Sequence, residues 1–215
     1  MTGIFMSFEG PDGAGKTSVL KQLIPQLKEQ TAPTLLLTRE PGGDPISEAI
    51  RDVILDVKNV DMDARTEALL YAAARRQHLA ETVLPALSQG DTVISDRFVD
   101  SSIAYQGAGR QIGTQAVADL NQFATDGLTP ALTIYLDVPV KLGLERIQTQ
   151  RQDDYDRLDR EQVDFHERVH QAYLEIAKNN PNRVVTVDAT QPLVQVVADC
   201  LQVIKTHYPQ IFERK

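Results

Sequence analysis

Residues 10–17 read Gly10-Pro11-Asp12-Gly13-Ala14-Gly15-Lys16-Thr17 and match the pattern G-x-x-x-x-G-K-[ST]. An apolar run over residues 4–8 precedes them, and a helical pattern begins at Lys16. This order of strand, glycine loop and helix favours a phosphate-binding loop over the alternative, an ordinary glycine-rich turn with a surface lysine. Gly13 and Gly15 keep side chains away from backbone N–H groups that converge on a phosphate. We therefore predict a nucleoside triphosphate site, with Lys16 at the β and γ phosphates and the Thr17 hydroxyl on Mg²⁺.

Four more apolar runs with strand character follow, at residues 34–38, 92–95, 131–136 and 183–187. Helical periodicity fills the segments between them, at residues 16–29, from Pro45 onward, at 64–88, 115–124, from Pro139 onward, at 161–178 and from Pro192 onward. Strands that alternate with helices favour a parallel sheet covered on both faces. The sequence therefore predicts an α/β fold of the P-loop NTPase type, a three-layer sandwich. Its five-stranded, mainly parallel sheet is flanked by helices in a single domain over 1–215.

The composition narrows the class of protein. Hydrophobic residues make up 42% of the 215, which is ordinary for a soluble globular chain. A formal net charge of −8 argues against a nucleic-acid partner, so an anionic ligand needs a local cluster of donors. The single cysteine, Cys200, cannot form an internal disulfide and falls on an apolar helical face, which suits a reducing compartment. Because no signal peptide or membrane-spanning run is visible, we expect a cytoplasmic protein without a membrane partner.

An acid and an arginine, Asp96 and Arg97, follow the run 92–95. The carboxyl ends of parallel strands form the edge at which α/β proteins bind ligands. Asp96 could there hold Mg²⁺ through water, and Arg97 could contact a phosphate with two nitrogens. The alternative is a salt bridge within a turn.

The helical pattern over 64–88 has two distinct stripes. One stripe contains Leu69, Ala73, Arg76, Ala80, Leu84 and Leu87, and the opposite one contains Tyr71, Arg75 and His78. An aromatic ring and a guanidinium on one face could grip a planar base by stacking and by donation to a carbonyl. A solvated polar face that carries a tyrosine is the alternative. On the later helix at 115–124 we expect Val117, Leu120 and Phe123 to pack inward.

Residues 146–160 form the most charged stretch of the chain and include Arg146, Arg151 and Arg157. In a phosphoryl-transfer enzyme such a stretch suits a lid that brings arginines to the site when it closes. A solvated mobile loop is the alternative.

A second motif competes with the phosphate-binding loop. The run His166-Glu167-Arg168-Val169-His170 matches H-E-x-x-H within a helical segment, as in zinc metallopeptidases. A third protein ligand is not evident, because the last histidine, His207, falls on another predicted helix. The surrounding charges suit solvated histidines, so zinc chemistry is the weaker hypothesis.

A phosphate-binding loop alone does not identify the molecule that receives the phosphate. N-K-x-D is missing, as is D-x-x-G outside the loop itself, which argues against a GTPase. The ordered set that remains is Phe8-Glu9 with the loop, Thr38-Arg39-Glu40-Pro41-Gly42-Gly43, Asp96-Arg97-Phe98, Ser101-Ser102-Ile103-Ala104-Tyr105-Gln106-Gly107, Tyr135-Leu136-Asp137-Val138-Pro139 and Asp156-Arg157-Leu158. This set, which covers almost the whole chain, resembles bacterial thymidylate kinases.

The resemblance implies Mg²⁺-dependent transfer of the ATP γ-phosphoryl group to dTMP, which gives dTDP and ADP. It implies that Arg97 and Arg39 hold the acceptor phosphate, and that Asp12 lies near the sugar 3′-hydroxyl. The base would meet Arg75 and Tyr71, with Ser102 and Gln106 completing its pocket. Tyr105 would crowd the sugar 2′ position, and Arg146 would pack on adenine beside the loop at 188–192.

The resemblance also bears on the catalytic arginine and on assembly. Some relatives carry an arginine in the loop where this chain has Gly13, so the lid must supply that charge here, from Arg151 or Arg157. The family likeness further suggests a homodimer. The rival functions are a kinase for another small nucleotide or nucleoside, and a P-loop module that hydrolyses nucleoside triphosphate without an acceptor.

Overall fold

The centre of the molecule is a sheet of five parallel strands. The computed structural model describes residues 3–31, 34–150, 157–158 and 161–212. The strands are β1 (Ile4–Glu9), β2 (Leu35–Arg39), β3 (Thr92–Asp96), β4 (Leu132–Asp137) and β5 (Val184–Asp188), in the spatial order β2-β3-β1-β4-β5. All neighbouring pairs run parallel, so the predicted α/β fold is confirmed and the sheet is parallel throughout.

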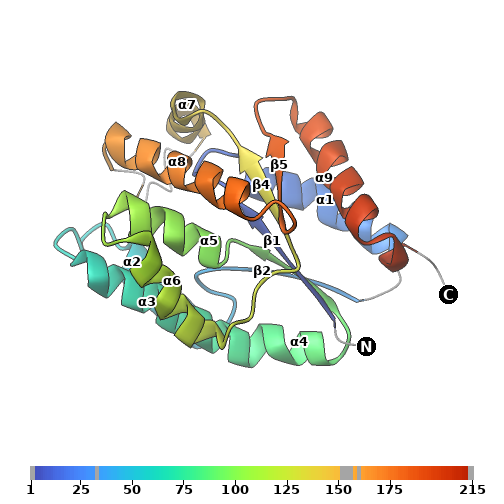
Figure 1. Cartoon of the computed structure of the whole chain (residues 1–215), viewed down its shortest axis with the longest axis horizontal. Coiled ribbons are helices and arrows are strands. Elements are labelled where there is room, and N and C mark those ends of the chain that lie inside the picture. Colours follow the sequence, from blue (N-terminus) through green and yellow to red (C-terminus); the bar gives the residue numbers. More distant parts are fainter. Residues whose placement is uncertain (1–2, 32–33, 151–156, 159–160, 213–215) are drawn as a thin grey trace.

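Helices cover both faces of this sheet (Figure 1). They are α1 (Lys16–Gln30), α2 (Pro45–Leu55), α3 (Ala64–His78), α4 (Leu84–Ser88), α5 (Val99–Ser102), α6 (Thr114–Thr125), α7 (Val140–Gln150), α8 (Val163–Asn179) and α9 (Leu193–His207). A π-helical segment, Leu79–Val83, joins α3 to α4, and a second one, Ile103–Gly109, continues α5. Within the described part of the chain, no helix is both long enough and apolar enough to cross a membrane.

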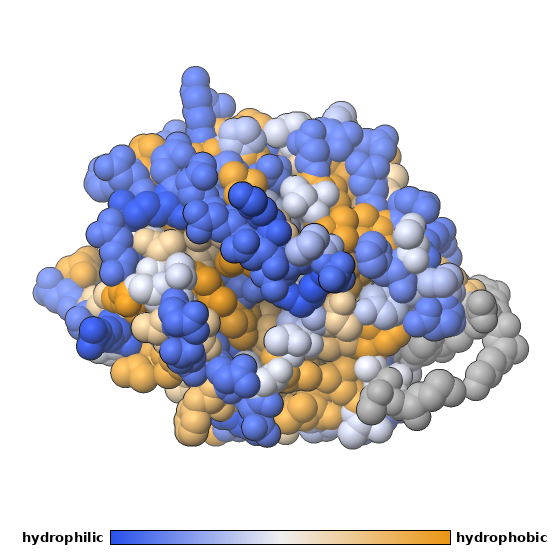
Figure 2. Space-filling model, viewed as in Figure 1, coloured by the Kyte–Doolittle hydropathy of each residue, from blue (hydrophilic) through white to orange (hydrophobic). Residues whose placement is uncertain are grey.

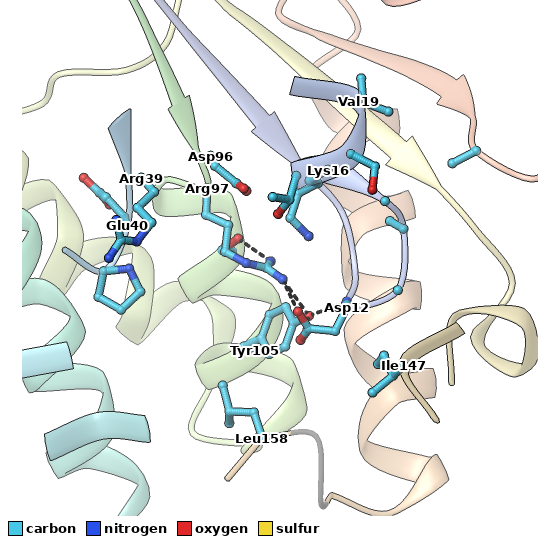
Figure 3. A pocket seen from close by; sticks show the side chains of 18 of the residues that line it. Asp12, Lys16, Val19, Arg39, Glu40, Asp96, Arg97, Tyr105, Ile147 and Leu158 are labelled. Atoms are coloured by element: carbon cyan, nitrogen blue, oxygen red, sulfur yellow. Dashed lines mark hydrogen bonds and ion pairs between the residues drawn. The ribbon is translucent and has the colours of Figure 1, made fainter. Parts of the chain in front are cut away.

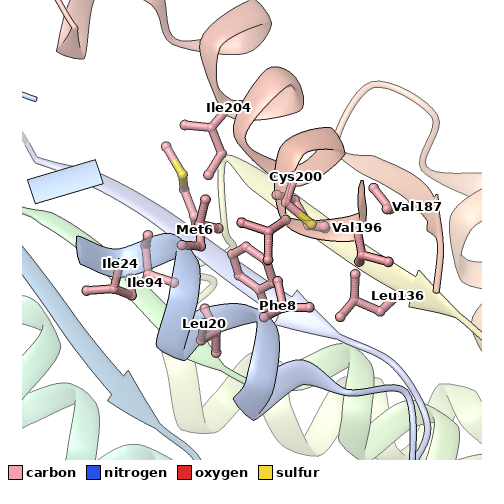
Figure 4. Close-up of a cluster of buried hydrophobic side chains, with 14 of the residues drawn as sticks. Met6, Phe8, Leu20, Ile24, Ile94, Leu136, Val187, Val196, Cys200 and Ile204 are labelled. Atoms are coloured by element: carbon pink, nitrogen blue, oxygen red, sulfur yellow. The ribbon is translucent and has the colours of Figure 1, made fainter. Parts of the chain in front are cut away.

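The larger hydrophobic core lies between the sheet and the pair α1 and α9 (Figure 4). Alternation along β1 sends Met6 and Phe8 into it, and both are fully buried. Cys200 enters the same core from α9, where burial raises the pKa of its thiol to about 12. The cysteine is therefore a small buried side chain, as the sequence predicted.

The opposite face of the sheet is more polar and carries aromatic rings. Tyr135 of β4 stacks on Tyr173 of α8 with ring centroids 5.2 Å apart. Next to them the hydroxyls of Ser7 and Thr133 share a hydrogen bond of 2.8 Å between neighbouring strands. Buried polar groups on this face extend from the sheet interior to its carboxyl edge, where the strands end.

That carboxyl edge brings together the chemically active strand ends. The register pairs Phe8 of β1 and Arg39 of β2 with Asp96 of β3. The phosphate-binding loop leaves β1 at this edge, and Arg97 leaves β3 beside it. Residues far apart in the sequence are thus adjacent because parallel strands all end on the same side.

One alternative about a helix face is excluded, and one expectation about another face is wrong. The solvated-face alternative for Tyr71, Arg75 and His78 fails, because Arg75 and His78 are buried while Leu69 on the other stripe is 56% exposed. Phe123, expected to pack inward from α6, is 87% exposed. Helical spacing predicts which residues share one face of a helix, but it does not predict which face is buried. A face with apolar residues can point outward when the neighbouring helices already fill the core.

The helical segment at 99–109 was not expected, since its polar and glycine-rich composition disfavours a helix. Its glycines serve close packing instead. A Cβ at Gly109 would lie 2.6 Å from a ring carbon of Phe165 in α8, and a Cβ at Gly107 would lie 2.9 Å from the backbone of Thr114. Tertiary contact therefore overrides the local preference of this segment.

Candidate active site

The loop between β1 and α1 has glycine where its backbone requires it. Gly13 and Gly15 have φ of 77° and 87°, in the left-handed region that glycine adopts without steric cost. Gly15 precedes α1, and no described side chain caps that end of the helix. The first N–H groups of α1 are therefore available to an anion, which the positive end of the helix dipole also favours.

Lys16 lies folded along this loop. Its Nζ donates to the carbonyl oxygens of Gly10 and Pro11, at 2.9 and 3.1 Å. Burial, with a contribution from the nearby Arg97, lowers the pKa of Lys16 to about 8. An arriving phosphate would favour the charged ammonium, so the residue is prepared to bind an anion.

Arg97 stands opposite Lys16 in Figure 3 and is held by hydrogen bonds on both terminal nitrogens. Nη1 donates to the carbonyl oxygen of Gly10 at 3.0 Å, and Nη2 donates to Asp12 Oδ1 at 2.6 Å. Tyr105 adds its hydroxyl to the same group by donating to Asp12 Oδ2 at 2.7 Å. Burial alone would lower the pKa of Arg97, but Tyr105 and Asp12 raise it well above its ordinary value. The guanidinium therefore stays charged inside the site.

A buried acid, Glu9, fixes the backbone around Arg97. Its Oε1 accepts from the backbone N–H of Phe98 at 2.7 Å, and its Oε2 accepts from the hydroxyls of Ser101 and Tyr173. Tyr173 in turn accepts from Arg97 Nη1 at 3.3 Å. Burial, and the charge of Asp100 next, raise the pKa of Glu9 to about 7.

Asp96 carries a buried polar atom without a hydrogen-bond partner in the part of the chain that the structure describes. Its Oδ1 is buried and has no hydrogen bond among the described residues. A buried oxygen without a donor calls for an explanation, and a bound cation or its water is one. Together with the Thr17 hydroxyl in the same cavity, this oxygen fits Mg²⁺, which takes one or two protein oxygens plus phosphates and water.

These groups open into a cavity of about 850 Å³ at the carboxyl edge of the sheet. The predicted site residues that line it are Asp12, Gly13, Ala14, Gly15, Lys16, Thr17, Arg39, Tyr71, Arg75, Asp96, Arg97, Ser102, Tyr105, Gln106 and Arg146. The structure thus brings both halves of the predicted site into one space. Figure 3 shows Arg39 and Glu40 on one side of Arg97, with Lys16 and Asp12 on the other.

One end of the cavity has Arg75 in its wall. Arg75 donates from Nε to Glu40 Oε2 at 2.6 Å, from Nη1 to Ser102 Oγ at 3.0 Å and to Asn121 Oδ1, and from Nη2 to the carbonyl oxygen of Phe98 at 3.1 Å. His78 supports Glu40 from behind through Nδ1, at 3.0 Å. The guanidinium is therefore rigidly placed, as recognition of a planar ligand requires.

The other end of the cavity is closed by Arg146 of α7. Its two terminal nitrogens lie 3.0 Å from the carbonyl oxygen of Ala189, and Nη1 also donates to the carbonyl oxygen of Gly13 at 3.3 Å. The planar guanidinium thus joins the phosphate-binding loop to the loop after β5, which the sequence also placed on this side.

Comparison with known proteins agrees with this geometry. A family model described as thymidylate kinase matches residues 8–200. A thymidylate kinase from Lacticaseibacillus casei (strain BL23) is 64% identical over 213 residues, which cover 99% of this chain and 100% of that protein. The chain belongs to the thymidylate kinase family. A thymidylate kinase from Enterococcus faecalis (strain ATCC 700802 / V583) is similar too, with 56% identity over 212 residues, 99% of this chain and 100% of that one.

The fold of a solved thymidylate kinase matches as well. The crystal structure of the thymidylate kinase from Ehrlichia chaffeensis superposes with a TM-score of 0.74 at 30% identity, covering 95% of this chain and 99% of that one. The family assigned from the sequence motifs is thereby confirmed, and so is the nucleotide-binding kinase class.

Of the two arginines predicted for the lid of this thymidylate kinase family member, the structure describes Arg157 and not Arg151. Arg157 does not line the cavity; it is buried, donates from Nε to the carbonyl oxygen of Ile54 at 3.0 Å, and pairs through Nη2 with Glu67. Arg151 lies outside the described residues. Gly10 and Pro11, also predicted to contact ATP, turn the loop without lining the cavity.

Gly13 has a structural reason to stay glycine in this member of the family. A Cβ at this position would lie 2.1 Å from the carbonyl oxygen of Gly143 in α7. An arginine there would require α7 to move away from the loop. The structure is therefore consistent with a charge supplied from outside the loop.

The H-E-x-x-H motif has another explanation. His170 pairs through Nε2 with Asp137 at 2.8 Å, and this hydrogen bond raises its pKa. His166 is buried, which lowers its pKa. Among the described residues, no group of three or more His, Cys, Asp and Glu could hold a metal, so the zinc hypothesis has no support in the structure.

Sequence reasoning missed the residues that hold the functional ones in place. Glu9 and Tyr173 support Arg97, Glu40 and Asn121 support Arg75, and Glu67 supports Gln106. A buried acid in a strand or on the inward stripe of a helix is a signal in principle, since burial of a carboxylate requires partners. Which arginine or amide each acid meets depends on the tertiary fold and is not visible in spacing.

Proposed function

We propose that this thymidylate kinase transfers the γ-phosphoryl group of ATP to dTMP and releases dTDP and ADP. The observation that carries the proposal is the single cavity that holds a phosphate-binding loop at one place and a charged arginine, Arg97, facing it. A site for one nucleoside triphosphate would not need two further arginines, Arg97 and Arg75, each held in place by several hydrogen bonds. Two nucleotides with their phosphates meeting between Lys16 and Arg97 account for both.

Each substrate would use one end of the cavity. ATP would place its phosphates on residues 10–17 and its adenine against Arg146. For dTMP, Arg97 and Arg39 would bind the phosphate, Asp12 would face the 3′-hydroxyl, and the base would lie by Tyr71, Arg75, Ser102 and Gln106. The hydroxyl of Tyr105 donates to Asp12, the residue proposed to face the sugar, and this position supports the proposed role of Tyr105 in excluding nucleotides with a 2′-hydroxyl.

Positioning and charge account for most of phosphoryl-transfer catalysis. Lys16 and the first N–H groups of α1 would hold the donor phosphates, while Arg97 fixes the acceptor phosphate oxygen for in-line attack. Bound at Thr17 and Asp96, Mg²⁺ would neutralise charge on the phosphates. We assign the further transition-state arginine to Arg151 of the lid at 146–160, because Arg157 is engaged with Glu67 and Ile54 and does not line the cavity.

A panel of acceptors tests the proposal. ADP release from ATP would be measured with dTMP, dUMP, dCMP, AMP and thymidine as acceptors. We expect the largest kcat/KM for dTMP. Equal use of all monophosphates would favour a broader nucleotide kinase, and turnover that ignores every acceptor would favour a simple nucleoside triphosphatase.

We also propose that two copies associate through α2, α3 and α6, in the reducing cytoplasm that suits a lone buried cysteine. Large apolar side chains are exposed on the outer faces of these packed helices: Ile46 (54%), Val53 (47%), Leu69 (56%) and Phe123 (87%). Figure 2 shows hydrophobic residues among hydrophilic ones over the region of α3 and α6. Exposed apolar groups on adjacent helices are typical of a surface that a partner covers, and a second copy is the partner that the family likeness supports.

A further inference from the structure

A buried acid, Glu67 of α3, stands behind the wall of the cavity at its Arg75 end. Its side chain is fully buried and accepts from Gln106 Nε2 at 2.8 Å, from Arg110 Nε at 3.2 Å and from Arg157 Nη2. Burial disfavours a charge here, but Arg110 and the hydrogen bonds from Gln106 and Arg157 hold the pKa of Glu67 below its ordinary value. Glu67 is therefore an ionised carboxylate.

An ionised carboxylate accepts hydrogen bonds and cannot donate them. The amide of Gln106, which has a donating and an accepting end, must therefore turn its nitrogen toward Glu67. Its Oε1 is left for the cavity that Gln106 lines, and no donor within the described residues reaches that oxygen. The wall thus offers a fixed acceptor at this point.

Arg75 offers the opposite chemistry beside it. A guanidinium has five N–H groups and no acceptor. Nε, both N–H groups of Nη1 and one of Nη2 are used on Glu40, Ser102, Asn121 and Phe98. The second N–H of Nη2 remains for a ligand, so this end of the cavity presents one donor and one acceptor.

We infer that Glu67, acting through the amide of Gln106, is a specificity-determining positioning residue that selects a pyrimidine with a ring N3–H next to a 4-oxo group. This inference rests on the proposed placement of the acceptor base at Gln106 and Arg75. A 4-oxo base gives N3–H to the Gln106 oxygen and accepts from Arg75 at O4. A 4-amino base reverses both groups, so acceptor would face acceptor and donor would face donor.

Reversal of the Gln106 amide would remove the mismatch of the two acceptors at N3, although not the mismatch of the two donors at Arg75, and Glu67 is what prevents the reversal. Sites with buried hydrogen-bonding groups reject mismatched analogues strongly, because the site's own groups are left unpaired. A hydrogen bond to a charged group contributes enough to bias the amide orientation by roughly tenfold to hundredfold. The discrimination should fall by that factor when the charge is removed.

The cleanest probe is 5-methyl-dCMP, which keeps the methyl group of dTMP and changes only the 4-oxo, N3–H edge. The wild-type protein should prefer dTMP over 5-methyl-dCMP by about 10³-fold or more in kcat/KM. Comparable use of the two would overturn the inference without any variant. Failure to phosphorylate dTMP at all would instead contradict the proposed function.

Glu67→Gln is the decisive variant, since it keeps the shape and lets the Gln106 amide turn. The dTMP to 5-methyl-dCMP ratio should fall about tenfold to hundredfold. The dTMP to dUMP ratio should not change, because both bases carry N3–H and O4. Arg110→Gln is the matched control: it removes a cation from the same carboxylate but leaves the carboxylate as acceptor, so the first ratio should stay near wild type.

An unchanged ratio in Glu67→Gln, or an equal fall in Arg110→Gln, would overturn the inference in favour of a purely structural acid. Gln106→Met provides a second test that leaves Glu67 intact. It removes the oxygen acceptor and should lose the same discrimination, and a ratio like that of wild type would contradict the inference.

Discussion

Arg97 directly follows strand β3 and has an unfavourable backbone conformation. Its φ of 72° lies in the left-handed region, which costs a residue other than glycine roughly 1–3 kcal/mol. The N–H of Arg97 donates to Phe8, and the N–H of Phe98 donates to Glu9, so two hydrogen bonds hold the turn. Strain maintained by such support is typical of a functional residue.

We predict that Arg97→Ala lowers kcat/KM for dTMP by about 10²–10³-fold, because a preorganised charge on the acceptor phosphate is lost. ATP binding should change little, since Lys16 and the loop remain. Steady-state kinetics and equilibrium binding of a fluorescent ATP analogue measure the two effects. Arg65→Ala, an exposed arginine on α3 away from the cavity, is the control. Unaltered dTMP kinetics in Arg97→Ala would remove this residue from the site.

Glu9 makes stability depend on pH. Its pKa is raised from 4.5 to about 7 by burial and by the charge of Asp100, so the folded protein holds a proton that the unfolded chain has lost in that window. The contribution of Glu9 is fully present below pH 4.5 and is lost as pH rises through about 7. The unfolding free energy of wild type relative to Glu9→Gln should therefore decrease over this range and be level above it.

Urea unfolding of both proteins between pH 4.5 and 8.5 measures that difference. Glu9→Gln has a similar shape but cannot titrate, so titration of all other groups cancels in the comparison. Parallel curves across the window would mean that the pKa of Glu9 is not raised in the folded protein.

The sequence predicts the charged groups that line the cavity better than the groups that hold them in place. Lys16, Asp96 and Arg97 stand at fixed positions after strands, and parallel topology alone brings them together. Glu9 and Glu67 act through partners about 40 to 160 residues away, such as Gln106 and Tyr173. Such partners are set by helix packing, for which a single sequence has no local signal.

Two arginines of the charged stretch 146–160, Arg151 and Arg157, are expected to have different roles. We predict that Arg151→Ala reduces kcat by about 10³-fold with a modest change in KM, as expected for a charge that acts in the transition state. Arg157→Ala should instead lower the free energy of unfolding by roughly 1–3 kcal/mol, because Glu67 loses a buried partner. Kinetics and thermal unfolding of the two variants separate the roles. A larger loss of kcat in Arg157→Ala with unchanged stability would reverse the assignment.

The sequence predicts the ends of the strands to within one residue. Short apolar runs bounded by residues that favour turns, such as glycine and proline, can form few structures other than a buried strand. The helical segment at 99–109 is not predicted in this way, because Gly107 and Gly109 oppose a helix until α6 and α8 pack against them. The sequence does not predict which side of α3 is buried, for a related reason. Its inward stripe carries an arginine and a histidine whose partners, Glu40 and Asn121, come from other elements.

The outer surface of the whole molecule makes a prediction about assembly. Leu69→Glu should convert a dimer into a monomer, because it places a charge in the apolar surface of α2, α3 and α6. Light scattering coupled to size-exclusion chromatography measures the mass. Val194→Glu, on α9, is a matched control, since Val194 is 75% exposed on another helix and should leave the dimer intact. A wild-type protein that is monomeric at all concentrations would contradict the proposed assembly.

The proposed function makes the phosphate-binding loop the meeting point of two nucleotides, with Lys16 on the donor side and Arg97 on the acceptor side. The fate of the γ-phosphoryl group tests this most directly. With radiolabelled γ-phosphate on ATP, the label should appear in dTDP, in equal amount to the ADP formed and only when dTMP is present. Label released as inorganic phosphate, at a rate that dTMP does not change, would contradict transfer between two bound nucleotides.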